Sequence, residues 1–205
     1  MSKDNSTPHA IASGRPLILG STSRYRKELL ARLCIPFQVE APEVDETPQA
    51  QESPKDLALR LALAKARAVA KKYPDAVVIG SDQVADLEGE PLGKPGNHTN
   101  AVKQLKRMRG KTVIFQTALS VVCVATGFEQ TDLAAVKVTF RDLTDAEIES
   151  YLKAEEPYDC AGSAKSEGLG IALLAAIDND DPTALIGLPL IRTCHMLRAA
   201  GVKLL

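Results

Sequence analysis

The sequence contains no tryptophan, few aromatic residues (4%) and almost no excess charge, with a formal net charge of -1. This charge gives no bulk electrostatic attraction to DNA or RNA, so nucleic acid is not an expected partner. No run of residues is long and apolar enough to cross a bilayer, so no membrane association is predicted. The four cysteines form no CxxC pair and have no histidine at zinc-finger spacing. Neither a disulfide framework nor a structural zinc site is predicted, and a reducing, cytoplasmic location is expected.

The composition that remains is that of an ordinary globular protein. The 205 residues are 45% hydrophobic and 25% charged, which suits one α/β folding unit better than a string of modules. Residues 1–15 are largely polar and lack the apolar core of a secretion signal, so we expect a flexible leader that does no chemistry. Residues 16–205 are expected to form a single domain.

Strand-like and helical segments alternate along this domain. Apolar runs and turn residues predict strands over 17–19, 37–39, 76–82, 112–125 and 134–143, with a hairpin at 88–90 and a paired ribbon turning at 126–127. The expected helices are one with Leu29, Leu30, Leu33 and Cys34 on its apolar face, followed by 54–72, 99–109, 145–156 and a last helix between Pro189 and Gly201.

Two of these helices carry explicit start signals. Ser53 suits an N-cap, Pro54 suits the first helical position, and Asp56 favours the positive end of the helix dipole. Thr144 with Glu147 three residues later matches a capping box.

The segment GSTSRYRKELL, residues 20–30, is typical of a phosphate-binding corner. Small residues let the backbone approach a ligand, and a helix N-terminus points N–H groups at it. Arg24, Arg26 and Lys27 add positive charge. A capped helix with solvated basic residues explains the same pattern, so this segment alone does not decide.

The triplet SDQ, residues 81–83, ends a hydrophobic strand-like run, which places Asp82 at the predicted strand tip. A carboxylate beside an apolar core is costly unless a cation, a metal or backbone donors meet it, which favours a functional role. The alternative is an aspartate that caps the next turn.

An acidic loop with Glu43, Asp45 and Glu46 could supply oxygen ligands to Mg²⁺ together with Asp82, although such loops are often simply solvated. Lys65 within a helix and Lys94 in a GKP corner would ordinarily be surface charges.

The segment CAGSAKSEGLG, residues 160–170, has three glycines, which indicate unusual backbone geometry or close approach to a ligand. An ordinary ordered loop explains them nearly as well. The histidines at positions 9, 98 and 195 are unrelated in spacing, and none is assigned a catalytic role.

Taken in order, the segments LILGSTSRYRKELL, APEVDETP, LALAKA, IGSDQV, GKP, VTFRDLT, EPYDCAGSAKSEGLG and IGLPL closely resemble the Maf family of nucleoside triphosphate pyrophosphatases. The resemblance covers nearly the whole chain after Pro16. It implies a two-lobed α/β fold, like that of inosine triphosphate pyrophosphatases, with an elongated mixed sheet flanked by helices and a cleft between the lobes. It also implies a homodimer and metal-dependent release of pyrophosphate.

Within this family, SDQ and KSEG resemble the branch that acts on 7-methyl-GTP, whereas the branch acting on dTTP and UTP usually has Asp-Thr and Gln at the two places. By this resemblance Asp82 is the catalytic proton acceptor, and Tyr25, Gln83 and Glu167 occupy specificity positions. One departure is Arg24-Tyr25, where this branch commonly has Pro-Trp. A tyrosine face still attracts the cationic ring of 7-methylguanine, by roughly 0.5–2 kcal/mol, and Glu167 could pair with the donors on its Watson–Crick edge.

For such a reaction, we expect the following roles around the triphosphate. Mg²⁺ or Mn²⁺ is expected on Glu46 and Asp82, with Asp45 as a further candidate ligand. The residues expected to bind phosphate are Ser21, Arg26, Lys27, Lys65 and Lys94. Two alternatives stay open: a pyrophosphatase of broader or dTTP/UTP type, and a nucleotide-binding regulator of septum formation with little hydrolysis.

Overall fold

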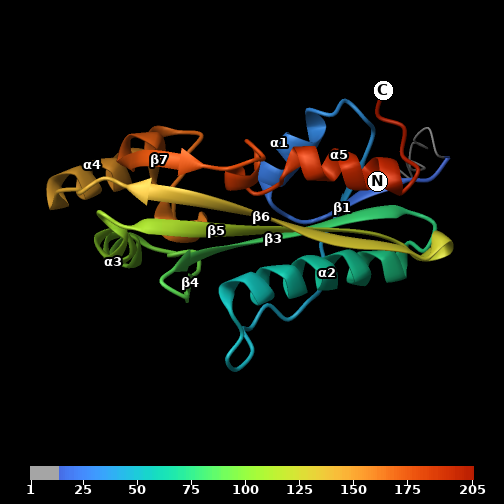
Figure 1. The fold of residues 1–205 in the computed structure, drawn as a ribbon, viewed down its shortest axis with the longest axis horizontal. Helices are drawn as coiled ribbons and strands as arrows, with labels where there is room; N and C mark the ends of the chain where they lie inside the picture. Colours follow the sequence, from blue (N-terminus) through green and yellow to red (C-terminus); the bar gives the residue numbers. More distant parts are fainter. Residues whose placement is uncertain (1–13) are drawn as a thin grey trace, which may run out of the picture.

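A computed structural model describes residues 14–205. His9 and the first 13 residues of the predicted leader lie outside the described part of the chain. The protein is built around one elongated, mixed seven-stranded sheet with helices on both faces (Figure 1). The predicted fold class, an α/β fold with an elongated mixed sheet flanked by helices, is confirmed.

The sheet has the strand order β2-β1-β3-β5-β6-β7, and β4 pairs separately with β3. β2 and β3 run parallel to β1, and the remaining pairs are antiparallel. The strands are β1 (Leu17–Gly20), β2 (Gln38–Glu40), β3 (Val77–Leu87), β4 (Glu90–Leu92), β5 (Thr112–Cys123), β6 (Phe128–Phe140) and β7 (Leu174–Asp178). The long β3, β5 and β6 run through the whole molecule and join its two halves (Figure 1).

The helices divide between these halves. They are α1 (Arg24–Ala31), α2 (Pro54–Lys72), α3 (His98–Met108), α4 (Asp145–Glu155) and α5 (Leu190–Ala199). Apolar residues of α1 and α5 pack with those of β1, β3 and β5 in one core. Residues of α3 and α4 form a second core with the far ends of β5 and β6. The two halves thus have separate hydrophobic cores on one shared sheet.

The predicted start signals are confirmed. The Ser53 side chain accepts a hydrogen bond from the Asp56 amide, with Pro54 in the first turn of α2. Thr144 and Glu147 form a reciprocal capping box at the start of α4. These caps satisfy amides that otherwise have no partner in the first helical turn.

Close packing of α2 on β3 follows from small residues on both elements. A Cβ atom added at Gly80 would lie 2.3 Å from the Ala62 carbonyl oxygen and 2.5 Å from the Ala66 amide nitrogen. Only glycine therefore permits this approach of helix and strand. Lys65 shares the buried face of α2 with Ala62 and Ala66, and the packing turns its side chain inward toward β3.

One edge of β3 is open over four residues. β1 ends at Gly20, which pairs with Gly80, and β4 begins to pair with β3 only at Ala85. On this edge, residues 81–84 therefore have no strand beside them. The prediction that the strand ends at Asp82 is wrong, because β3 continues to Leu87. Asp82 lies at a gap between neighbouring strands instead of at a strand tip.

Other elements also differ from the predictions. α1 ends at Ala31, before Leu33 and Cys34, because Cys34 has a φ of 54° and Pro36 disfavours helical geometry at Ile35. β6 starts at Phe128, six residues before the predicted strand, and β7 was not predicted. The β7 residues, LAAID, do not alternate between apolar and polar, so the sequence carries no strand signal here. All but one of them are exposed.

Candidate active site

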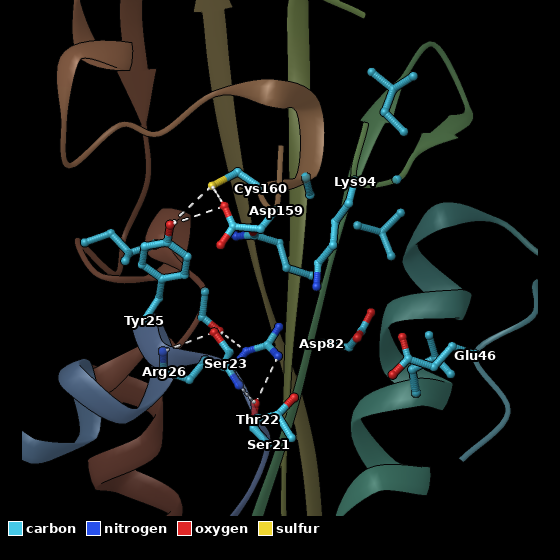
Figure 2. Close-up of a pocket in the computed structure, with 18 of the residues that line it drawn as sticks. Ser21, Thr22, Ser23, Tyr25, Arg26, Glu46, Asp82, Lys94, Asp159 and Cys160 are labelled. Atoms are coloured by element: carbon cyan, nitrogen blue, oxygen red, sulfur yellow. Dashed lines mark hydrogen bonds between the residues drawn. The ribbon is translucent and has the colours of Figure 1, made fainter. Parts of the chain in front are cut away.

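A cavity of about 730 Å³ opens at the gap beside β3. Its walls come from the loop after β1, the first half of α2, the hairpin and corner around β4, and the segments around residues 160 and 186. Figure 2 shows side chains from these distant parts of the chain pointing into one space. The gap between β1 and β4 therefore gathers most of the polar residues singled out from the sequence.

One corner of the cavity is formed by Ser21, Ser23 and Arg26, here called the serine–arginine corner. Ser23 is the N-cap of α1, and its side chain accepts a hydrogen bond from the Arg26 amide. An Arg26 terminal nitrogen lies 3.4 Å from Ser21 Oγ, within hydrogen-bonding distance (Figure 2). Burial lowers the pKa of the Arg26 guanidinium, and the negative charges of Asp82 and Glu46 act in the opposite direction. A helix N-terminus and a half-buried arginine together favour an anionic ligand.

The Gly187 carbonyl oxygen holds the Arg26 side chain in position. It accepts a hydrogen bond from Arg26 Nε at 2.9 Å and another from Ser81 Oγ at 3.0 Å. Gly187 has a φ of 127°, which favours glycine. Ser81 thus connects β3 to the arginine through a single backbone oxygen.

Glu46, Lys65 and Asp82 form the acid–lysine centre of the cavity. Lys65 Nζ lies 2.7 Å from Asp82 Oδ1 and 2.8 Å from Glu46 Oε1. Asp82 is 7% and Lys65 5% exposed, so the interpretation of Lys65 as a surface charge is wrong. The ammonium compensates the cost of burying Asp82, and it brings the loop carboxylate of Glu46 to the same point.

The donor set of this centre fits a hard divalent cation shared with a substrate. Two carboxylates, Glu46 and Asp82, converge here, and among the residues that the structure describes no three acidic, histidine or cysteine side chains come together to form a metal site. Mg²⁺ is commonly held by one or two carboxylates, with phosphate oxygens and water completing its octahedron. The pair therefore suits a metal that arrives with a polyphosphate.

The aromatic end of the cavity comprises Arg24, Tyr25, Asp159 and Cys160. Burial raises the pKa of Tyr25 to about 12 and that of Cys160 to about 11, so both groups are neutral at physiological pH. The Tyr25 hydroxyl lies 3.5 Å from Asp159 Oδ1 and 3.7 Å from Cys160 Sγ (Figure 2). A neutral ring beside a carboxylate offers a surface on which a planar group can stack.

Gln83 lines the cavity but is also tied to its wall. Its side-chain nitrogen lies 2.9 Å from Thr117 Oγ1 and 3.0 Å from the carbonyl oxygens of Ala184 and Leu185. The amide therefore holds the short helical turn at residues 184–186 against the sheet.

The cavity brings together most of the residues named from the sequence. Its lining includes Ser21, Tyr25, Arg26, Glu46, Lys65, Asp82, Gln83, Lys94 and Glu167. Lys27 and Asp45 are not part of this lining. Lys27 is exposed, about 100° around α1 from Arg26, and the Asp45 carboxylate accepts a hydrogen bond from the Thr47 amide within its own loop.

The sequence assigned no role to Asp159 or Cys160, which both line the cavity. Asp159 and Cys160 stand inside the segment EPYDCAGSAKSEGLG that carries part of the family resemblance, but no spacing rule connects them to Tyr25. Their contact is a product of the tertiary fold.

Within residues 14–205, none of the helices has the length and apolar character needed to cross a membrane.

Comparison with known proteins points to one family. The family model described as "Maf-like protein" matches residues 16–200. A 7-methyl-GTP pyrophosphatase of Polaromonas sp. (strain JS666) is 72% identical over 192 residues, covering 94% of this chain and 88% of that protein. The protein of the same name from Albidiferax ferrireducens is 72% identical over 191 residues, covering 93% and 96%. That from Methylobacillus flagellatus is 58% identical over 190 residues, covering 93% and 99%.

Proposed function

The chain belongs to the Maf family, and from this premise and the chemistry of its cavity we propose that it hydrolyses 7-methyl-GTP to the monophosphate and pyrophosphate, clearing a modified nucleotide. The observation that carries the proposal is the convergence of a buried carboxylate, a half-buried arginine and an aromatic ring in one cavity. Nucleotides need all three kinds of contact, because they combine a planar base with a polyanion.

The triphosphate is placed along the cationic side of the cavity. Arg26, Ser21 and the free amides at the start of α1 bind its oxygens, and Lys94 reaches into the same space from the corner after β4 (Figure 2). Lys65 neutralises the two carboxylates that face the phosphates. Such fixed positive groups balance the charge that builds up on the departing pyrophosphate.

Asp82 is placed as the proton acceptor. Its position is fixed by β3 and by the Lys65 ammonium at 2.7 Å. In this role it orients a water molecule and accepts its proton as the oxygen attacks the α-phosphorus in line. The bond from the α-phosphorus to the bridging oxygen breaks, and pyrophosphate leaves without a covalent enzyme intermediate.

A divalent cation, Mg²⁺ or Mn²⁺, completes the proposal, and Glu46 and Asp82 would hold it. When bound, it supplies charge neutralisation for the phosphate oxygens. Asp45, whose carboxylate is engaged with the Thr47 amide, is a less suitable ligand.

The choice of 7-methyl-GTP rests on the aromatic end and on the names of the relatives. Methylation at N7 makes the guanine ring a cation, which the Tyr25 face attracts, and Glu167 lines the same cavity as a partner for donors on the edge of the base. Gln83 supports the wall beside the base. Uncharged pyrimidines gain less from these groups.

We further propose that the enzyme acts in the cytoplasm as a homodimer. The four free cysteines are compatible with a reducing compartment. The dimer follows from the family resemblance alone.

The test is product analysis with purified full-length protein and Mg²⁺, using 7-methyl-GTP, GTP, dTTP and UTP in parallel. We expect monophosphate and pyrophosphate, with the highest kcat/KM for 7-methyl-GTP, loss of turnover with a chelator and recovery on adding Mg²⁺ or Mn²⁺. Release of orthophosphate would contradict the reaction, and equal turnover of the four nucleotides would contradict the specificity. Binding without turnover would favour the regulator.

A further inference from the structure

The aromatic end already holds a planar cation, contributed by the protein itself. The Arg24 guanidinium carbon lies 4.7 Å from the centroid of the Tyr25 ring, and its Nη2 donates to the Tyr25 hydroxyl at 2.7 Å. The same nitrogen is 3.5 Å from Asp159 Oδ2. An aromatic face and a carboxylate therefore bind one flat, delocalised positive group from two sides.

A guanidinium and an N7-methylated purine ring share the features that this arrangement recognises. Both are planar, both spread a single positive charge over a conjugated system, and both carry N–H donors at their edge. A face of Tyr25 attracts such a cation, and a nearby carboxylate adds a charge-assisted contact. Arg24 thus occupies the place that suits a cationic base.

We propose that Asp159 is a specificity-determining residue that recognises the positive charge of an N7-methylated purine stacked on Tyr25, and that Arg24 gives up this place when the base binds. The proposal rests on the proposed function and assigns recognition of the methylated base to Asp159. Asp159 is suited to the role because it approaches the Tyr25 hydroxyl, at 3.5 Å, from the side of the ring (Figure 2).

The expected effect is moderate because the groups are open to solvent. The side chains of Arg24 and Asp159 are 65% and 56% exposed, and water and salt weaken contacts between exposed charges. Removing Asp159 leaves the Tyr25 face in place, and an exposed charge pair of up to about 1 kcal/mol corresponds to a preference of about two- to fivefold.

The sign of the effect separates this role from a general electrostatic one. A carboxylate near a triphosphate repels every nucleotide, so its removal should tighten binding of all of them. If Asp159 recognises a cationic base, its removal weakens binding of the methylated nucleotide relative to the unmethylated one. The ratio of the two KM values cancels the contribution of the common triphosphate.

The experiment compares Asp159→Asn with wild-type enzyme on 7-methyl-GTP and GTP, measuring KM and kcat for each. We expect the ratio KM(GTP)/KM(7-methyl-GTP) to fall about two- to fivefold, with kcat for 7-methyl-GTP within about twofold of wild type. Asp159→Glu, which keeps the charge, should recover most of the ratio. Asp142→Asn is the matched control, since Asp142 is exposed and lies outside the cavity, and it should leave the ratio unchanged.

Each other outcome has a defined meaning. A ratio that does not fall below the wild-type value in Asp159→Asn, or that falls equally in Asp142→Asn, would overturn the role of Asp159 while the proposed function stands. A wild-type enzyme that does not prefer 7-methyl-GTP would instead refute the proposed specificity. Thermal unfolding of each variant identifies a folding defect. If Asp159→Asn has such a defect, recovery of the KM ratio by Asp159→Glu decides whether the carboxylate has this role.

Discussion

The acid–lysine centre and the aromatic end lie in one cavity but are built differently. In the centre, the side chains of Lys65 and Asp82 are buried and in contact at 2.7 Å. At the aromatic end, the side chains of Arg24 and Asp159 are 65% and 56% exposed and lie 3.5 Å apart. The centre is thus a fixed arrangement, whereas the aromatic end can rearrange around a ligand. We infer that the reaction depends on the first and the choice of base on the second.

The difference has its origin in the supporting elements. Lys65 and Asp82 project from a long helix and a central strand whose backbones touch at Gly80. Asp159 and Cys160 belong to a turn between α4 and the short helix at residues 161–163. Groups on regular elements are held more precisely than groups on connecting segments.

The largest effect in this comparison should come from Asp82→Asn. The amide keeps the shape but cannot accept a proton, so kcat should fall by about 10²–10⁴ while nucleotide binding persists. Steady-state kinetics and binding titration measure the two quantities. Asp86→Asn, on the same face of β3 but outside the cavity lining, is the control. Near-normal turnover in Asp82→Asn would exclude the role.

A smaller effect is expected from Ser81→Ala, which removes one of the two donors to the Gly187 carbonyl oxygen. Losing one hydrogen bond corresponds to about 1 kcal/mol, so looser positioning of Arg26 should raise KM for all nucleotides about three- to tenfold. The KM(GTP)/KM(7-methyl-GTP) ratio should not change. Ser120→Ala, which deletes a buried hydroxyl bonded to Thr131 elsewhere on the sheet, is the matched control. An equal rise in KM in both variants would point to a general loss of stability.

The smallest effect should come from Arg24→Ala at the aromatic end. A cationic base would no longer displace a like charge from Tyr25, so KM(GTP)/KM(7-methyl-GTP) should rise about two- to threefold. This shift is opposite in sign to that of Asp159→Asn. Arg32→Ala, an exposed change at the other end of α1, controls for net charge. A fall in the ratio for Arg24→Ala would mean that the arginine assists the cationic base.

The sequence was sufficient for the parts of the fold that depend on local signals. Caps such as Ser53 and Thr144 and the turn at Gly127 are encoded within a few residues, and the structure has them where they were predicted. β7 was not predictable in this way, because its exposed, alanine-containing residues show no periodicity and only pairing with β6 makes them a strand.

The candidate site was predictable as a list of residues but not as a geometry. Lys65 looks like an ordinary helix lysine until the contact at Gly80 shows that its side of α2 faces β3. Asp159 carries no local signal, since its partner Tyr25 lies 134 residues earlier in the chain. Neither contact can be read from spacing, because both depend on how distant elements pack.

The length of the open edge of β3 also limits the width of the cavity entrance. Four residues, 81–84, lie between the last residue paired to β1 and the first paired to β4, so these two residues are five steps or roughly 17 Å apart at about 3.3 Å per residue. The space available to a ligand is therefore set by where two neighbouring strands stop. Extending the β3–β4 pairing by two residues would pair Val84 with Gly93 and Gln83 with Lys94, which would narrow this entrance and alter which ligands fit.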